Sequence, residues 1–154
     1  MFEPVLRERV NYVNAGLLAE ERGIAVVESR DTEVADYANL IEVRVTAKGE
    51  TIAFAGSVFG KGDTRIVSLF GYEFDISPDK YLLIVENTDK PGMIGQIGTL
   101  LGAGGVNVAT MQVSRNNLGT NAMMALTVDS ECSKQVLELM RGLDGIVGVW
   151  QVIL

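Results

Sequence analysis

The order of strand-like and helix-like segments in residues 81–154 is the feature that most limits the fold of this chain. These residues carry six segments, which run strand, helix, strand, strand, helix, strand. The segments are expected at residues 81–85, 91–103, 106–113, 121–129, 133–143 and 147–154. The second helix repeats apolar residues at i, i+3, i+4 and i+7. This order predicts the ferredoxin-like arrangement, a four-stranded antiparallel sheet with both helices on one face.

The first half of the chain has a different pattern, which predicts a second domain. A helix is expected over residues 10–22, with Gly23 as its C-cap. A polar connection is expected over residues 31–39, and strands separated by glycine-containing turns at 24–28, 40–46, 51–59, 64–70 and 72–75. A polar segment around Pro78 separates the two patterns. We therefore predict an α+β protein of two domains, residues 1–77 and residues 81–154.

The composition excludes several classes of function. The chain of 154 residues has no histidine, which removes the commonest general acid or base and the commonest metal ligand. Cys132 is its single cysteine, so neither an internal disulfide nor a cysteine-based zinc site is expected, and a cytoplasmic location is favoured. A net charge of −7 argues against nucleic acid as a partner, and the short apolar runs argue against a membrane span. We expect no catalytic residue and no metal site.

The joint between the first strand and the first helix of residues 81–154 carries hydrogen-bonding groups. Asn87 and Asp89 follow the apolar strand, and the helix is expected to begin near Pro91, where a missing N–H costs nothing. Exposed backbone N–H groups at a helix start favour an anion such as a carboxylate. Asp89 at the same place is a suitable acceptor for an ammonium group. The joint therefore predicts a receptor for a small zwitterion.

The helix that follows is spaced by glycines, but not as a nucleotide-binding loop is. Neither G-x-G-x-x-G nor a G-K-[ST] ending occurs. Three glycines share one stripe of the helical wheel: Gly95, Gly98 and Gly102. The adjacent stripe is apolar and is expected to face the sheet: Ile94, Ile97 and Leu101. An interior glycine costs up to about 1 kcal/mol relative to alanine, so the stripe suggests close approach by another helix. Both the second helix of this chain and the first helix of a partner chain remain open as that neighbour.

Asp89 and Asn107 stand at opposite ends of this helix. A helix of about 12 residues at ~1.5 Å per residue places them ~18 Å apart, so one amino acid cannot touch both in one chain. Two such helices packed antiparallel about a two-fold axis would bring Asp89 of one chain near Asn107 of the other. Alternatively, Asn107 only adopts a turn conformation after two glycines.

Several motifs resemble a known family. Residues 81–92, followed by 105–108, resemble an ACT domain, a class of domain that binds amino acids and regulates metabolic enzymes. Residues 94–101 with 111–115 are most similar to the serine-sensing ACT domain of D-3-phosphoglycerate dehydrogenases. Upstream, residues 10–15, 18–24 and 71–75 resemble the intervening, allosteric substrate-binding domain of the long form of these dehydrogenases.

The resemblance implies which residues bind an effector. In the family, serine lies between paired ACT domains, so Asp89 and the partner's Asn107 are the implied ligands. The carboxylate of serine is expected at the backbone N–H groups of Met93 and Ile94, with its other polar groups near Asn87. Asn87 departs from the family, where histidine or tyrosine is frequent at this position.

The family's intervening domain is also thought to bind a phosphorylated substrate or phosphate through basic side chains. Lys61 and Arg65, beside a glycine-rich turn, are the candidate anion-binding residues here. The alternative is an ordinary solvated charged turn.

The resemblance implies a regulatory module without catalysis, which binds L-serine and gives feedback inhibition in the first step of serine biosynthesis. No cofactor is expected in this chain, and NAD is expected in the catalytic part of the parent enzyme. The implied partners are L-serine or a similar amino acid and a second copy of the chain, with a tetramer possible for the parent. Two alternatives stay open: a regulatory part of iron–sulfur L-serine dehydratase, and a purely structural dimerisation module.

Overall fold

The computed structural model describes residues 11, 13–30, 37–116 and 119–154. These residues form three α-helices and two four-stranded antiparallel sheets. The α+β class predicted from the sequence is therefore confirmed. By its contacts the chain divides into two compact units, Met1–Ala35 and Asp36–Leu154, and both sheets belong to the second unit.

The first unit contains α1, which spans Ala15–Glu21. This helix is shorter than the one predicted over residues 10–22, and residues 10 and 12 of that prediction lie outside the described residues. The strand predicted over residues 24–28 is wrong, since these residues have no regular structure. A strand requires a hydrogen-bonded neighbour, and no described strand pairs with this segment. Most of the polar connection predicted over residues 31–39 lies outside the described residues.

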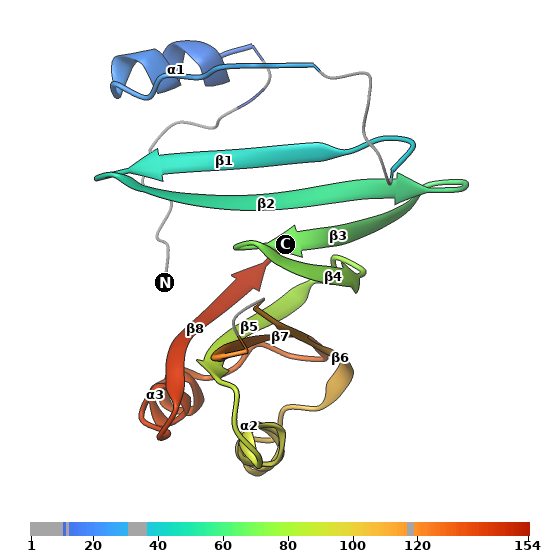
Figure 1. Cartoon of the computed structure of the whole chain (residues 1–154), viewed down its shortest axis with the longest axis vertical. Helices are drawn as coiled ribbons and strands as arrows, with labels where there is room; N and C mark the ends of the chain where they lie inside the picture. Colours follow the sequence, from blue (N-terminus) through green and yellow to red (C-terminus); the bar gives the residue numbers. More distant parts are fainter. Residues whose placement is uncertain (1–10, 12, 31–36, 117–118) are drawn as a thin grey trace. The chain divides into compact units, whose positions relative to one another are not determined.

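The N-terminal sheet of the second unit is a meander in the order β1-β2-β3-β4 (Figure 1). Its strands are β1 (Ile41–Ala47), β2 (Glu50–Phe59), β3 (Asp63–Leu69) and β4 (Tyr72–Ile76). The turn between β1 and β2 places Lys48 and Gly49 at φ of 54° and 83°. Positive φ at both central residues matches the twist of a tight hairpin, so the meander predicted from the sequence forms.

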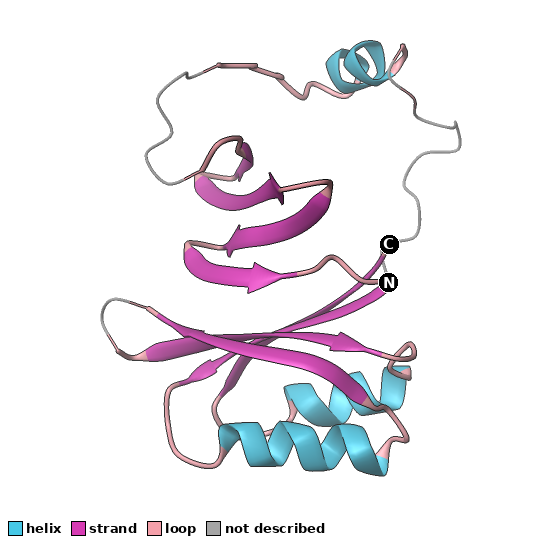
Figure 2. Ribbon diagram, turned by 90° about the vertical axis from the view of Figure 1, so that its right-hand side faces the viewer, coloured by secondary structure: helices cyan, strands magenta, loops and turns pink. Residues whose placement is uncertain are grey.

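The remaining elements form a ferredoxin-like sheet in the order β6-β7-β5-β8. They are β5 (Tyr81–Thr88), α2 (Met93–Ala103), β6 (Val108–Arg115), β7 (Asn121–Val128), α3 (Lys134–Arg141) and β8 (Ile146–Ile153). All neighbouring strands are antiparallel, and both helices lie on one face of the sheet (Figure 2). The βαββαβ prediction is confirmed.

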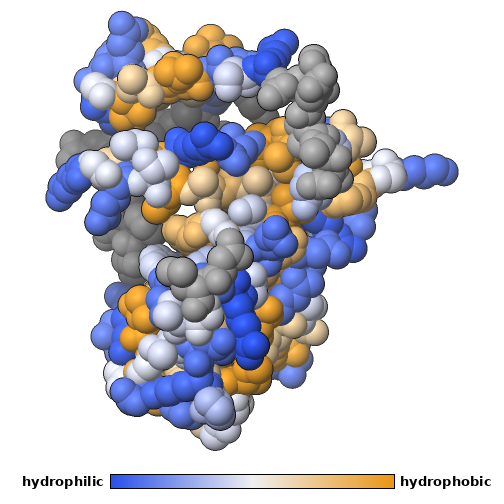
Figure 3. Space-filling model, in the orientation of Figure 1, coloured by the Kyte–Doolittle hydropathy of each residue, from blue (hydrophilic) through white to orange (hydrophobic). Residues whose placement is uncertain are grey.

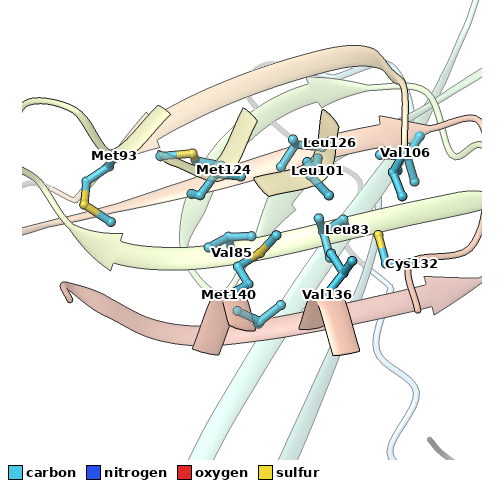
Figure 4. Packing of buried hydrophobic residues seen from close by; sticks show 13 residues of the cluster. Leu83, Val85, Met93, Leu101, Val106, Met124, Leu126, Cys132, Val136 and Met140 are labelled. Carbon is cyan, nitrogen blue, oxygen red and sulfur yellow. The ribbon is translucent and has the colours of Figure 1, made fainter. Parts of the chain in front are cut away.

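The helices and the sheet enclose the main hydrophobic core (Figure 4). On α2 the buried residues are Met93, Ile97 and Leu101, which recur every four residues on one side of the helix. The expectation that Ile94 faces the sheet is wrong, because Ile94 is 53% exposed whereas Met93 is only 2% exposed. One residue step turns the side chain by about 100°, so Met93 and Ile94 cannot both face the sheet squarely.

The opposite face of the ferredoxin-like sheet is also covered, by β3 and β4 of the N-terminal sheet. The buried residues that meet there are Leu82, Ile84, Met123 and Ala125 from one sheet and Leu69, Tyr72, Phe74 and Ile76 from the other. Because β5 and β7 are covered on both faces, each is a nearly continuous run of buried residues. Burial on both faces explains why these strands lack polar alternation.

Several side-chain contacts join the two sheets. The hydroxyl of Tyr72 donates to Glu86 Oε1 at 3.3 Å, and the backbone N–H of Asp75 donates to Gln112 Oε1 at 2.9 Å. Phe70 and Trp150 stack with their ring centroids 5.4 Å apart. These contacts place Glu86, which precedes Asn87 in β5, at the junction of the sheets.

Candidate functional site

The joint singled out in the sequence is shorter than predicted. Strand β5 continues to Thr88, so Asn87 is a strand residue, and α2 begins at Met93 instead of near Pro91. Gly92 precedes the helix with φ of 92°, a conformation that glycine adopts without strain. None of the described side chains caps α2, so its first backbone N–H groups, those of Met93 and Ile94, have no capping acceptor among the described residues. Free N–H groups at a helix start favour an anion, and anion binding at α2 stays a prediction.

Asn87 is the most unusual residue at this joint. It is 1% exposed, and it lies on the helix side of β5 because Leu83 and Val85, which alternate with it, face the helices. Its Nδ2 donates to the carbonyl of Thr88 at 2.7 Å, but its Oδ1 accepts no hydrogen bond from the described residues. A buried acceptor without a donor costs about 1–3 kcal/mol. A ligand donor at this atom would recover that free energy.

Asp89 lies beside the same helix start and already has a cationic neighbour. Arg115 Nε is 2.9 Å from Asp89 Oδ2, and the Asp89 side chain is 22% exposed. The backbone N–H of Asp89 donates to the carbonyl of Thr120 at 3.0 Å. The sequence predicted Asp89 as an open acceptor, but no sequence signal assigned Arg115 to it, because the two residues are brought together only by the pairing of β5, β6 and β7.

A second ion pair flanks the helix start. Lys90 binds Asp144, and hydrogen bonding by the ammonium holds the pKa of the Asp144 carboxyl below its usual range. The next residue, Gly145, accepts a hydrogen bond from the Thr88 N–H at 2.7 Å. A Cβ at Gly145 would lie 2.8 Å from Lys90 Cε, and the φ of 92° at this position favours glycine. The loop after α3 is thereby held against the joint.

Asn107 is not part of this group within one chain. Its Nδ2 donates to Asp129 Oδ2 at 2.7 Å, and its carbonyl accepts from the Asp129 N–H at 3.1 Å. In Figure 4, Met93 and Val106 lie at opposite ends of the buried cluster, and Asn107 directly follows Val106. The structure therefore brings Asn87, Asp89 and the start of α2 together, and leaves Asn107 at the other end of the helix.

The glycine stripe of α2 does not contact the second helix of this chain. A Cβ built at Gly95, Gly98 or Gly102 meets no atom within 4 Å. The close approach of α2 to α3 occurs instead at Gly104, where a Cβ would lie 2.5 Å from Val136 Cγ2. The sequence left two possible neighbours for this stripe. The prediction that the stripe packs on the second helix of the same chain is therefore wrong. Packing of the stripe on a partner helix stays a prediction.

Arg65, one of the two candidate anion-binding residues, is already paired with carboxylates. Its guanidinium binds both oxygens of Asp63 at 2.9–3.0 Å and lies 3.5 Å from Asp75. The hydrogen bond between them lowers the pKa of Asp63 and raises that of Arg65. Lys61 lies in the turn between β2 and β3, whose tip is hydrophilic (Figure 3). This geometry fits a solvated charged turn, and anion binding stays a prediction.

The part of the chain that the structure describes contains no metal site, no membrane-spanning helix and no activated cysteine. No three of its His, Cys, Asp and Glu residues could hold a metal ion together. None of its helices is long and apolar enough to cross a membrane. Cys132 is 2% exposed, and burial raises the pKa of its thiol, so it is not an activated nucleophile.

These features define a class of protein: an α+β chain that joins a four-stranded meander to a ferredoxin-like domain with an uncapped helix start. Residues 1–70 match the family model described as the D-3-phosphoglycerate dehydrogenase intervening domain. The resemblance predicted from the motifs is confirmed, and the chain is similar to the D-3-phosphoglycerate dehydrogenases.

Individual relatives extend the similarity over nearly the whole chain. The D-3-phosphoglycerate dehydrogenase of Synechocystis sp. is 36% identical over 99% of this chain, and that of Archaeoglobus fulgidus is 39% identical over 96%. These matches cover 27% and 28% of the relatives, so the chain spans about a quarter of their length. Among solved structures, the ACT domain from a GTP pyrophosphokinase of Chlorobium tepidum is 17% identical, covers 47% of this chain and 95% of its own, and has a TM-score of 0.39.

Proposed function

We propose that this chain is the regulatory part of a D-3-phosphoglycerate dehydrogenase and that it binds L-serine or a similar small amino acid. Residues 1–77 would be part of the intervening domain, and residues 81–154 would be the ACT domain. The observation that carries the proposal is the buried Oδ1 of Asn87, which has no donor among the described residues, beside the uncapped start of α2. An amino acid offers the two groups that this arrangement needs, an N–H donor and a carboxylate.

The chemistry of the site follows from these groups. The carboxylate of the ligand accepts hydrogen bonds from the N–H groups of Met93 and Ile94, where the helix dipole favours negative charge. The ammonium binds Asp89 and donates to Asn87 Oδ1. The remaining polar group of the ligand binds the partner's Asn107.

A second copy of the chain completes the site in this proposal. Gly95, Gly98 and Gly102 leave one side of α2 open, which permits close packing on the same helix of a partner. An antiparallel pair about a two-fold axis creates two equivalent sites, because each chain contributes both halves. The amino acid then bridges the two chains and stabilises the pair.

Regulation follows because the amino acid binds the paired chains more tightly than the separate chains. A ligand that binds the pair more tightly can shift the catalytic domains by no more than its difference in affinity between the two states. In the parent, a cytoplasmic homo-oligomer in this proposal, serine would lower the rate of NAD-dependent oxidation. This chain itself supplies neither catalysis nor a cofactor.

Calorimetry with L-serine tests the proposal. We expect Asp89→Ala and Asn107→Ala each to weaken binding by about tenfold or more, because each removes a polar partner of the ligand. Asp79→Ala is the matched control, because Asp79 is an exposed acidic residue in the segment that connects β4 to β5. This variant should bind L-serine as the unchanged chain does. Unchanged binding in both site variants would rule out the assigned site.

A purely structural dimerisation module is the second candidate. Asp89 is already paired with Arg115, and Asn107 with Asp129, so both implied ligands are engaged within the chain. Dimerisation that is independent of serine, together with no binding of any amino acid, would favour this candidate.

A further inference from the structure

The strand register places Arg115 in the candidate site. Arg115 of β6 pairs with Ala122 of β7, and Ala122 pairs with Asn87 of β5. Residues that pair directly across antiparallel strands point to the same face of the sheet. Arg115, Ala122 and Asn87 therefore form one row on the face that carries the helices.

Ala122 is the middle member of this row, between the two polar residues. It is 1% exposed, and its side chain is a single methyl group. The neighbouring row on the same face carries Met124 between Val113 and Val85, where a long side chain fills the middle position. A small buried residue therefore separates an arginine from an unsatisfied amide in this row.

The ion pair between Arg115 and Asp89 uses only part of what each group offers. The contact joins Nε of Arg115 to one oxygen of Asp89, and the Arg115 side chain is 72% exposed. Neither Nη group of Arg115 nor Asp89 Oδ1 makes a further hydrogen bond to the residues that the structure describes. A guanidinium can bind a carboxylate with two parallel N–H donors, and a carboxylate oxygen can accept from an ammonium.

We propose that Arg115 is a ligand-binding residue that recognises the α-carboxylate of the effector, with Asp89 at the ammonium and Asn87 in the same row of the sheet as Arg115. This inference rests on the proposed function and restricts the effector to free α-amino acids that carry both charges. A zwitterion fits beside the pair because each of its charges faces an opposite one. Arg115 adds a charged donor to the backbone N–H groups at the start of α2.

An alternative role for the ion pair between Arg115 and Asp89 makes the opposite prediction. If Arg115 only occupied Asp89 and excluded the ammonium, its removal would make binding tighter. If Arg115 binds the carboxylate, its removal makes binding weaker, and the loss depends on the presence of a carboxylate in the ligand.

Calorimetry on the full chain separates these roles. We compare L-serine with L-serinamide, which keeps the ammonium and lacks the carboxylate, on the unchanged chain, on Arg115→Met and on Arg44→Met. Arg44 is the matched control, since it is also exposed and paired with a carboxylate, Glu42, but lies on β1. Circular dichroism checks that each variant is folded.

We expect Arg115→Met to weaken L-serine binding by about tenfold or more, the scale of one lost charge-assisted hydrogen bond. The unchanged chain should prefer L-serine to L-serinamide, and Arg115→Met should lose most of that preference, whereas Arg44→Met should behave as the unchanged chain. Equal or tighter binding of L-serine by Arg115→Met, or an unchanged preference over L-serinamide, would overturn the role of Arg115 and leave the proposed function standing. Absence of L-serine and other amino-acid binding by the unchanged chain would overturn both.

Discussion

The two sheets of this protein have the same number of strands and the same antiparallel pairing, but they are buried to very different extents. All but the first residue of β7 are buried, whereas every residue of β1 is exposed. The ferredoxin-like sheet is covered by helices on one face and by β3 and β4 on the other. The difference indicates that the ferredoxin-like half holds most of the folding free energy, since apolar burial is its main source.

The largest expected effect comes from one substitution made in both sheets. Val85→Ala in β5 should lower the free energy of unfolding by about 2–3 kcal/mol, because the side chain is fully buried and its loss leaves a cavity. Val45→Ala in β1, where the valine is 48% exposed, should cost less than about 1 kcal/mol. Urea denaturation followed by circular dichroism measures both. Equal losses would contradict the comparison and show that β1 is buried in solution.

A second pair of substitutions contrasts the glycine stripe of α2 with Gly104, which directly follows the helix. Gly104→Ala should destabilise the chain by about 1–3 kcal/mol, because its Cβ would lie 2.5 Å from Val136 Cγ2. Gly98→Ala meets no atom within 4 Å and should raise the stability of the monomer by up to about 1 kcal/mol through helix propensity. Urea denaturation of the dilute, monomeric chain measures both changes.

Self-association sharpens the second contrast. If the glycine stripe packs on a partner helix, Gly98→Ala should weaken dimerisation while it stabilises the monomer, and sedimentation equilibrium would detect the change. A dimer of unchanged strength would remove the stripe from the interface.

The smallest expected effect concerns the junction of the two sheets. Tyr72→Phe removes the hydrogen bond to Glu86 and should cost about 1 kcal/mol near neutral pH. Burial, with a smaller contribution from the Glu86 charge, raises the pKa of Tyr72 above its ordinary value of 10.0. As the pH rises, the unfolded chain therefore releases the proton of the Tyr72 hydroxyl before the folded chain does. The stability that this pKa difference contributes is present below pH 10.0 and is lost as the pH rises through the pKa of the folded chain.

The emission of Trp150, the chain's single tryptophan, can follow unfolding from pH 8 to pH 11. The unfolding free energy of the unchanged chain should fall more steeply above pH 10.0 than that of Tyr72→Phe. Parallel curves would mean that the Tyr72 hydroxyl is not buried at the junction.

Strand and helix order was predictable from the sequence, because it depends on local periodicity. Residues 24–28 show where that signal stops, since their strand-like composition found no described partner strand. Ile94 shows a second limit. Met93, not Ile94, faces the sheet with Ile97 and Leu101, which leaves Ile94 53% exposed, and apolar composition alone could not give this phase of the helix.

The candidate site was partly predictable, because some of its residues are near neighbours in the sequence. Asn87 and Asp89 stand next to a helix start in the sequence, and the structure places both there. Arg115 and Ala122 are 26 and 33 residues from Asp89 along the chain. Only the register of β5, β6 and β7 brings Arg115 and Ala122 into one row with Asn87.

The sequence by itself determined the α+β class, the βαββαβ order and the polar joint before α2, because these features depend on spacing between near neighbours. The tertiary structure decided which atoms at that joint are satisfied. Among the residues that the structure describes, it buried Asn87 Oδ1 without a donor, paired Asp89 with Arg115 and left the glycine stripe open. Burial and hydrogen bonding depend on groups that meet only when distant strands and helices pack, so local sequence patterns cannot specify them.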